Sequence, residues 1–184
     1  MTAVSEPSGV HVADYDPSWP RRAAVAIGAL RAAAPGLFVK IEHIGSTAVP
    51  GLPAKPVIDL MAAVHDLTHA APHQAALTDL GFHAHDNGMT DRLLYVRADG
   101  VVRSHVLHVV TLESWPTRNQ RIFRDHLRAH PEDAMRYAQL KRAIVAAGTG
   151  PREYARAKTA LVQELTDRAR AQLGLPSVPV WEKR

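Results

Sequence analysis

Cysteine is absent from this chain of 184 residues, so disulfide bonds and thiolate chemistry are excluded. A zinc site would have to rely on histidine and carboxylate ligands. Aromatic residues make up only 5% of the chain, and no dense block of lysine and arginine accompanies them. The composition therefore gives little support for a nucleic-acid partner. The formal net charge of +4 favours anionic ligands in general.

Long apolar runs are also missing, since none approaches the roughly 20 residues that a membrane-spanning helix needs. The first residues, MTAVSEPSGV, lack the charged start and the apolar stretch of a signal peptide. We therefore expect a cytoplasmic protein with no membrane partner. A hydrophobic fraction of 46% is enough for one core, and a length of 184 residues is too short for two ordinary domains. We expect a single domain at 12–174, between a flexible tail at 1–11 and an irregular tail at 175–184.

Periodicity and turn residues predict the order of the elements. A helix is expected from Ser18 to about Ala34, followed by strands within 37–45 and 56–64 and a helix near 69–80. Two further strands flank Asp99-Gly100, a dipeptide that suits a type I′ hairpin turn. From Ser114 onward the pattern is helical. The expected fold class is α+β, with a mixed and mostly antiparallel sheet flanked by helices, in which the strand at 56–64 neighbours the strand SHVLHVV.

The stretch KIEHIGSTAVPGLPAKPVIDLM, residues 40–61, joins two predicted strands through a loop rich in glycine and proline. Gly45 allows a sharp turn, after which the hydroxyl and N–H groups of Ser46 and Thr47 can hold an anion such as phosphate. A Gly-Ser-Thr stretch by itself is more often only a turn. Asp59 adds a carboxylate inside the second strand, where an unpaired charge would be costly. It must meet a cation, a metal or a water-filled cleft, or else bond to backbone N–H groups of the loop.

Four segments together resemble the GrpB family, also called UPF0157, of predicted nucleotidyltransferases: IEHIGSTAVPGLPAKPVIDLM, SHVLHVV, FRDHLRAHPEDAMRYAQLK and YARAK. The resemblance extends from about Val12 to Leu173, with the same order and spacing of segments. It implies a polymerase-β-like nucleotidyltransferase fold, in which a Gly-Ser turn holds a triphosphate and carboxylates on the next strand hold magnesium. Gly45, Ser46 and Asp59 match those positions. The resemblance thus implies a nucleotide-binding transferase with Mg²⁺ at Asp59.

One position departs from the superfamily pattern, which has a second carboxylate where this chain has Val57. Valine offers no oxygen ligand to magnesium, so a site for two metal ions is in question. Histidine is the alternative source of polar groups. His43 precedes the turn, whereas His105 and His108 lie on the neighbouring strand, three residues apart and therefore on opposite faces unless a bulge intervenes. We expect one of them to join Asp59 and His43 as a catalytic group, and a half-buried histidine bonded to the backbone is the alternative for each.

Basic side chains complete the candidates for binding phosphate. Lys55 lies in the Pro-flanked loop, Arg103 belongs to the hairpin, and Lys141 and Lys158 recur on the C-terminal helices. Each is also compatible with a solvated or paired surface charge. For Glu42, which precedes the turn, we expect a salt bridge.

Three hypotheses from different classes remain open. The first is an enzyme that binds a nucleoside triphosphate with magnesium and transfers a nucleotidyl group. The second is an enzyme that uses Asp59 and one histidine for acid/base chemistry on an anionic metabolite. The third is a noncatalytic module that binds a nucleotide or assists a partner, because domains of this family are also found fused to dephospho-CoA kinase.

Overall fold

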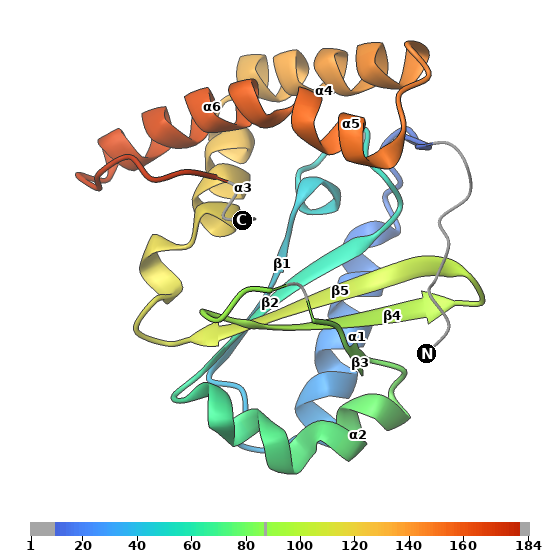
Figure 1. Ribbon diagram of the computed structural model, residues 1–184, viewed down its shortest axis with the longest axis vertical. Coiled ribbons are helices and arrows are strands. Elements are labelled where there is room, and N and C mark those ends of the chain that lie inside the picture. Colours follow the sequence, from blue (N-terminus) through green and yellow to red (C-terminus); the bar gives the residue numbers. More distant parts are fainter. Residues whose placement is uncertain (1–9, 87, 181–184) are drawn as a thin grey trace.

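The computed structural model describes residues 10–86 and 88–180, and these form a mixed sheet of five strands with helices on both faces (Figure 1). The strand order is β1-β2-β5-β4-β3. The strands β1 to β5 have these bounds: Lys40–Ile44, Ile58–Val64, His83–Ala84, Leu93–Asp99 and Val102–Thr111. β2 and β5 run parallel, and the other three pairs are antiparallel. The predicted fold class, α+β with a mixed and mostly antiparallel sheet flanked by helices, is confirmed, as is the adjacency of the Asp59 strand and SHVLHVV.

The helices follow the predicted start and stop signals. α1 begins directly after Ser18, carries a proline in its first turn, and ends just before Pro35-Gly36. The helices α1 to α6 have these bounds: Trp19–Ala33, Gln74–Asp79, Asn119–Ala129, Pro131–Ala146, Pro151–Ala157 and Thr159–Gln172. Short 3₁₀ helices η1, η2 and η3 occupy Ser46–Ala48, Leu67–His73 and Trp115–Thr117. The predicted helix at 69–80 is therefore divided between η2 and α2. No helix among the described residues is long and apolar enough to cross a membrane.

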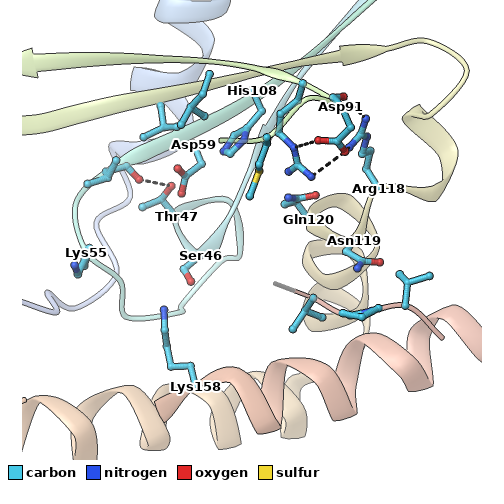
Figure 2. A pocket seen from close by; sticks show the side chains of 18 of the residues that line it. Ser46, Thr47, Lys55, Asp59, Asp91, His108, Arg118, Asn119, Gln120 and Lys158 are labelled. Carbon is cyan, nitrogen blue, oxygen red and sulfur yellow. Dashed lines mark hydrogen bonds and ion pairs between the residues drawn. The ribbon is translucent and has the colours of Figure 1, made fainter. Parts of the chain in front are cut away.

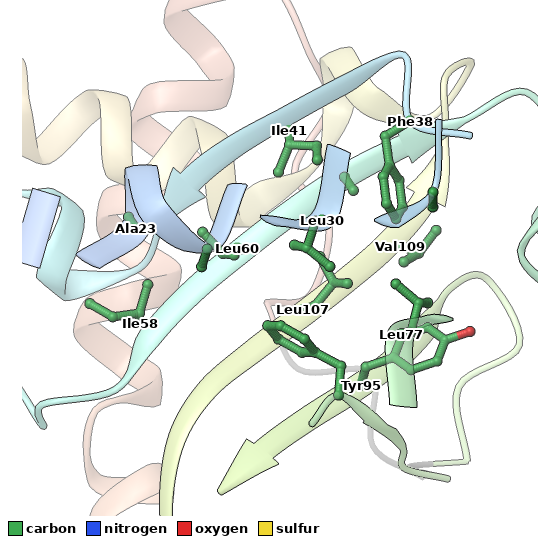
Figure 3. Packing of buried hydrophobic residues seen from close by; sticks show 14 of the residues in the cluster. Ala23, Leu30, Phe38, Ile41, Ile58, Leu60, Leu77, Tyr95, Leu107 and Val109 are labelled. Atoms are coloured by element: carbon green, nitrogen blue, oxygen red, sulfur yellow. The ribbon is translucent and has the colours of Figure 1, made fainter. Parts of the chain in front are cut away.

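The main core lies between α1 and one face of the sheet. On α1, buried residues recur at helical spacing from Trp19 to Leu30. They pack on alternate residues of β2 and β5, among them Leu60 and Leu107, as Figure 3 shows. This face of the sheet is closed, because the apolar side chains of α1 and α2 cover it.

The opposite face of the sheet carries the odd-numbered residues of β2 and is apolar along only part of its length. Met61, Ala63 and Val110 are closed off by Trp115 in a small cluster. Toward the start of β2, the same face presents Asp59 instead. The fold therefore leaves one stretch of this face available for a polar site, beneath the layer of α4, α5 and α6 (Figure 1).

Three details differ from the sequence predictions or lie outside them. The hairpin between β4 and β5 pairs Asp99 with Val102, so Gly100 and Val101 form the turn. Among the described residues only glycines have positive φ, and Gly100 has φ 61°, which excludes the predicted type I′ turn and matches type II′. The two-residue strand β3 was not predicted. Most of the predicted N-terminal tail lies outside the described residues, and residues 175–180 of the predicted C-terminal tail follow α6 without regular structure.

Candidate functional site

A cavity of about 810 Å³ lies between the sheet and the C-terminal helices. In Figure 2, Asp59 and His108 on the sheet face the same space as Ser46 of η1 and Lys158 at the α5–α6 junction. Of the residues that the structure describes, two acidic ones and seven lysines or arginines line it: Asp59, Asp91, Lys55, Arg92, Arg103, Arg118, Lys141, Lys158 and Arg170. The excess of positive charge makes the cavity suited to an anion.

The Gly-Ser turn holds its shape through contacts on both sides. Gly45 has φ 72° and ψ −173°, a conformation essentially restricted to glycine. A Cβ at this position would lie 2.5 Å from Asp59 Oδ2, so the carboxylate packs directly on the glycine. Thr47 Oγ1 donates to the carbonyl oxygen of Val57 at 3.2 Å and bonds His43 Nε2 at 2.8 Å. The Thr47 hydroxyl is thus engaged by the protein, although the residue lines the cavity.

Asp59 faces the cavity without a direct partner. Among the described residues no hydrogen bond or ion pair reaches its carboxylate. This excludes the alternative that Asp59 is a structural residue bonded to backbone N–H groups of the loop. Burial raises the pKa of Asp59 to about 7, and the charges of Lys158 and Arg103 oppose that shift. The carboxyl group is therefore close to half-protonated at neutral pH, and two cations act on it without a direct contact.

Lys158 and Lys55 are gathered around one aromatic ring. The ammonium of Lys158 lies 4.4 Å from the ring centroid of Tyr154, and that of Lys55 lies 5.2 Å from it. Burial lowers the pKa of Lys158 to about 8, Lys55 adds to this shift, and Asp59 opposes it. Tyr154 itself is buried. Two of the three predicted phosphate-binding lysines, one from the loop before β2 and one from the α5–α6 junction, therefore share the ring of Tyr154 at the cavity.

Lys141 has a different environment from Lys158. It is 1% exposed, and its ammonium donates to Ser46 Oγ at 3.2 Å and to the carbonyl oxygen of Pro53. Burial lowers the pKa of Lys141 to about 7, with a contribution from Lys158. Its ammonium also lies 4.5 Å from the ring centroid of Tyr137. Lys141 thus ties α4 to both ends of the Gly-Ser loop, and its contribution to the cavity is mainly to position Ser46.

Arg103 reaches the cavity from β5. Its Nε atom is buried and has no hydrogen-bond partner among the described residues, and no ion pair joins its guanidinium to a carboxylate there. Its charge acts on Asp59. A buried guanidinium nitrogen without a partner marks a place where a ligand oxygen would be bound favourably.

The structure separates the three candidate histidines. His43 pairs with Leu60, and His105 with Ile58, so both point to the α1 face of the sheet and neither lines the cavity. His108 lies on the same face as Asp59 and does line it, in agreement with strand alternation. Burial lowers the pKa of all three to about 4, so each is neutral at pH 7. His108 therefore cannot provide a protonated partner for Asp59.

Sequence reasoning missed a group of residues at the far end of the cavity. Asp91 accepts hydrogen bonds from Arg92 and Arg118, and Arg118 also donates to Ser114 Oγ at 2.8 Å. Burial alone would raise the pKa of Asp91, but these two arginines outweigh it and lower the pKa to about 2. The contact between Asp91 and Arg118 joins residues 27 positions apart in the chain, and no local sequence motif predicts it.

The segment after α6 was also missed as part of the site. Residues 178–180 line the cavity. Arg170 secures this segment, because its guanidinium donates to the carbonyl oxygens of Pro176 at 2.6 Å and Thr117 at 2.9 Å. Gln163 adds bonds to the backbone of Val178 and Val180. The predicted irregular tail is thus partly a wall of the cavity.

The residues of the cavity do not fit a site for two magnesium ions. Val57 lines the cavity where a second carboxylate would be needed. Among the described residues of the lining, Asp91 is the only other carboxylate, and it is bound to two arginines. In the part of the chain that the structure describes, no group of three or more histidine and carboxylate side chains is arranged to hold a metal. Magnesium prefers an octahedron of oxygen ligands, and Asp59 alone offers only one carboxylate.

Fold and cavity together define an α+β protein with a cationic site on one face of a mixed sheet. The family model described as GrpB protein matches residues 9–168. Because this match covers most of the sequence, the chain belongs to the GrpB family. A UPF0157 protein of Pseudomonas aeruginosa is 37% identical over 92% of this chain and 71% of its own length.

Two further similarities concern the fold and the domain context. The crystal structure of the conserved protein GrpB from Enterococcus faecalis aligns with a TM-score of 0.82 and 26% identity. That alignment covers 89% of this chain and 99% of the other. A dephospho-CoA kinase of Mycolicibacterium paratuberculosis is 26% identical over 73% of this chain and 39% of the kinase. The GrpB structure therefore has the same fold over nearly its whole length, and the kinase contains a similar segment within a longer chain.

Proposed function

We propose that the cavity binds a phosphorylated small molecule, and that a nucleotide is the class of ligand it takes. The observation that carries this proposal is the charge of the lining, whose described residues include seven lysines or arginines and two carboxylates. The side chains of Lys158 and Arg103 make no hydrogen bond or ion pair with the described residues, so their charges are available to a ligand. The resemblance to nucleotidyltransferases supports the nucleotide and, beyond binding, a transfer of its nucleotidyl group.

A second candidate function is acid/base catalysis on an anionic metabolite without nucleotidyl transfer. Asp59 favours it, because its carboxyl group faces the cavity unpaired and has a pKa of about 7, which suits a general base at neutral pH. Neutral His108 lies on the same wall and can accept or donate one hydrogen bond. A noncatalytic binding module is the third candidate. Release of pyrophosphate distinguishes the first function, and loss of turnover in Asp59→Asn distinguishes the second from the third.

Calorimetric titration of the protein with ATP tests the binding proposal. We expect Lys158→Met to weaken ATP binding by about tenfold or more, the effect of losing one charged contact worth roughly 1.4 kcal/mol. The matched control is Arg156→Met, which removes the same charge from an exposed position of α5 outside the cavity. Equal affinities in the two variants, or no binding of ATP by the wild type, would contradict the proposal.

A further inference from the structure

The cavity holds positive charge where a nucleotide-binding site of this kind would otherwise hold a metal ion. In a metal site, two or three carboxylates surround a divalent cation that neutralises the phosphates. Here, the charges of Lys158 and Arg103 act on the carboxylate of Asp59, and Val57 lines the same cavity. Figure 2 shows Lys158 reaching from the helical layer toward Ser46 and the wall that carries Asp59.

These two cations are held in place without being neutralised. The ring of Tyr154 packs against the ammonium of Lys158, and this contact orients the charge while leaving its three N–H donors for a ligand. The guanidinium of Arg103 has its Nε atom buried in the lining. Other basic residues of the cavity are committed to the protein, since Arg118 binds Asp91 and Arg170 binds backbone carbonyls. Lys158 and Arg103 can therefore neutralise the negative charge of a bound phosphate group.

We propose that this site binds polyphosphate groups without a divalent metal, because Lys158 and Arg103 supply the positive charge that magnesium supplies elsewhere. The inference rests on the proposed function and specifies it further. The ligand class is a molecule with at least two adjacent negative charges, such as the phosphates of a nucleoside di- or triphosphate. Lysine acts on such a ligand as a compact point charge, and arginine as a donor of paired hydrogen bonds.

Asp59 has opposite effects in the two kinds of site. In a magnesium site its negative charge holds the metal, so Asp59→Asn weakens phosphate binding. In a metal-free site the same charge repels the phosphates, so Asp59→Asn strengthens their binding. Asparagine has nearly the same shape and keeps the packing on Gly45. Whether Asp59→Asn strengthens or weakens phosphate binding therefore distinguishes a metal-free site from a magnesium site.

The experiment is calorimetric titration of the full chain with inorganic tripolyphosphate, in one buffer with EDTA and in another with excess Mg²⁺. We expect wild-type affinity in EDTA to equal or exceed that in Mg²⁺, since the metal-free ligand carries more negative charge. In EDTA, Asp59→Asn should bind about threefold or more tightly than wild type. Lys158→Met and Arg103→Met should each bind about tenfold or more weakly, and Arg156→Met should bind like wild type.

The outcomes separate this inference from the proposed function. Binding that occurs only in Mg²⁺, or a loss of affinity in Asp59→Asn, overturns metal independence and leaves phosphate binding intact. No binding of tripolyphosphate in either buffer overturns both. Melting curves show whether each variant is folded, and if Asp59→Asn unfolds, the two wild-type titrations decide the question without it.

Discussion

Gly45 and Asp59 are packed so closely that each determines what the other position can hold. A side chain at Gly45 would meet the Asp59 carboxylate and would also be strained at φ 72°. We expect Gly45→Ala to lower the free energy of unfolding by about 1 to 3 kcal/mol through backbone strain, and by more through displacement of Asp59. Gly51→Ala is the matched control, because Gly51 also has positive φ but open space around it. Equal losses in chemical denaturation would show that the Asp59 contact contributes nothing.

Lys158 should make ligand binding depend on pH in the alkaline range. Because its pKa is lowered to about 8, the protonated fraction falls from about nine-tenths at pH 7 to about one-tenth at pH 9. Asp59 and Lys141 titrate near pH 7, and Lys55 and Tyr154 also face this lysine. ATP is fully ionised above pH 8. We therefore expect ATP affinity to fall by about tenfold as pH rises from 8 to 9.5, because protonated Lys158 is lost.

The variant Lys158→Met is the control for this titration. It cannot lose a proton at that position, so its weaker binding should stay nearly constant above pH 8. The same decline in Lys158→Met as in wild type would assign the dependence to another group.

At single positions, strand alternation predicted more than residue chemistry did. The opposite orientation of His105 and His108 follows from their spacing, and it holds. The sequence could not show which of these two histidines lies in the cavity, because that depends on which face of the sheet α1 covers. Their neutral state was also not predictable, since burial lowers the pKa only once the surrounding residues are known.

Among the elements, α3 is the helix that fixes β1 and the Gly-Ser turn through charged contacts. Arg124 is 6% exposed and donates to the carbonyl oxygen of His43 at 2.7 Å and to Glu42 Oε2 at 2.8 Å. Arg121 also bonds Glu42, so the expected salt bridge of Glu42 exists and has two partners. Arg128 donates to the carbonyl oxygen of Ala48 at 2.9 Å. Three arginines of one helix thus hold the strand end from which the turn begins.

Removing Arg124 should therefore destabilise the fold. We expect Arg124→Met to lower the free energy of unfolding by about 2 to 3 kcal/mol, because hydrogen bonds to charged groups are lost in a buried site. Arg31→Met, at an exposed position of α1, should change it by less than about 0.5 kcal/mol. Urea denaturation of the two variants measures both values, and a cost for Arg124→Met as small as that of Arg31→Met would rule out this role.

Elements with strong local signals were predicted well from the sequence. α1 has proline and glycine at its ends, and the strands around residues 40–61 have β-branched residues and a Gly/Pro loop between them. The predicted type of the hairpin turn was wrong, because the pairing of Asp99 with Val102 shifts the turn by one residue. β3 has only two residues and no side chains that favour a strand, so its pairing with β4 comes from tertiary contact alone.

At the scale of the whole molecule, the cavity is assembled from segments that lie far apart in the sequence. The sequence predicts that Asp59, Ser46 and Lys55 lie together, because Ser46 and Lys55 belong to the loop that leads directly into the strand of Asp59. It could not reveal that Asp91, Arg118 and the segment after α6 complete the wall, because these contacts depend on how the C-terminal helices pack over the sheet. The same packing brings Lys158 to within reach of a ligand beside Asp59, 99 residues earlier in the chain.

The most direct test is a crystal structure of the protein grown with EDTA and with ATP at a concentration that saturates binding in solution. We expect density for the triphosphate in the cavity, with phosphate oxygens within hydrogen-bond distance of Lys158 and Arg103 and with no metal ion between them and Asp59. An ATP molecule bound outside the cavity, or a cavity without ATP under these conditions, would contradict the proposal that this cationic face of the sheet is the ligand site.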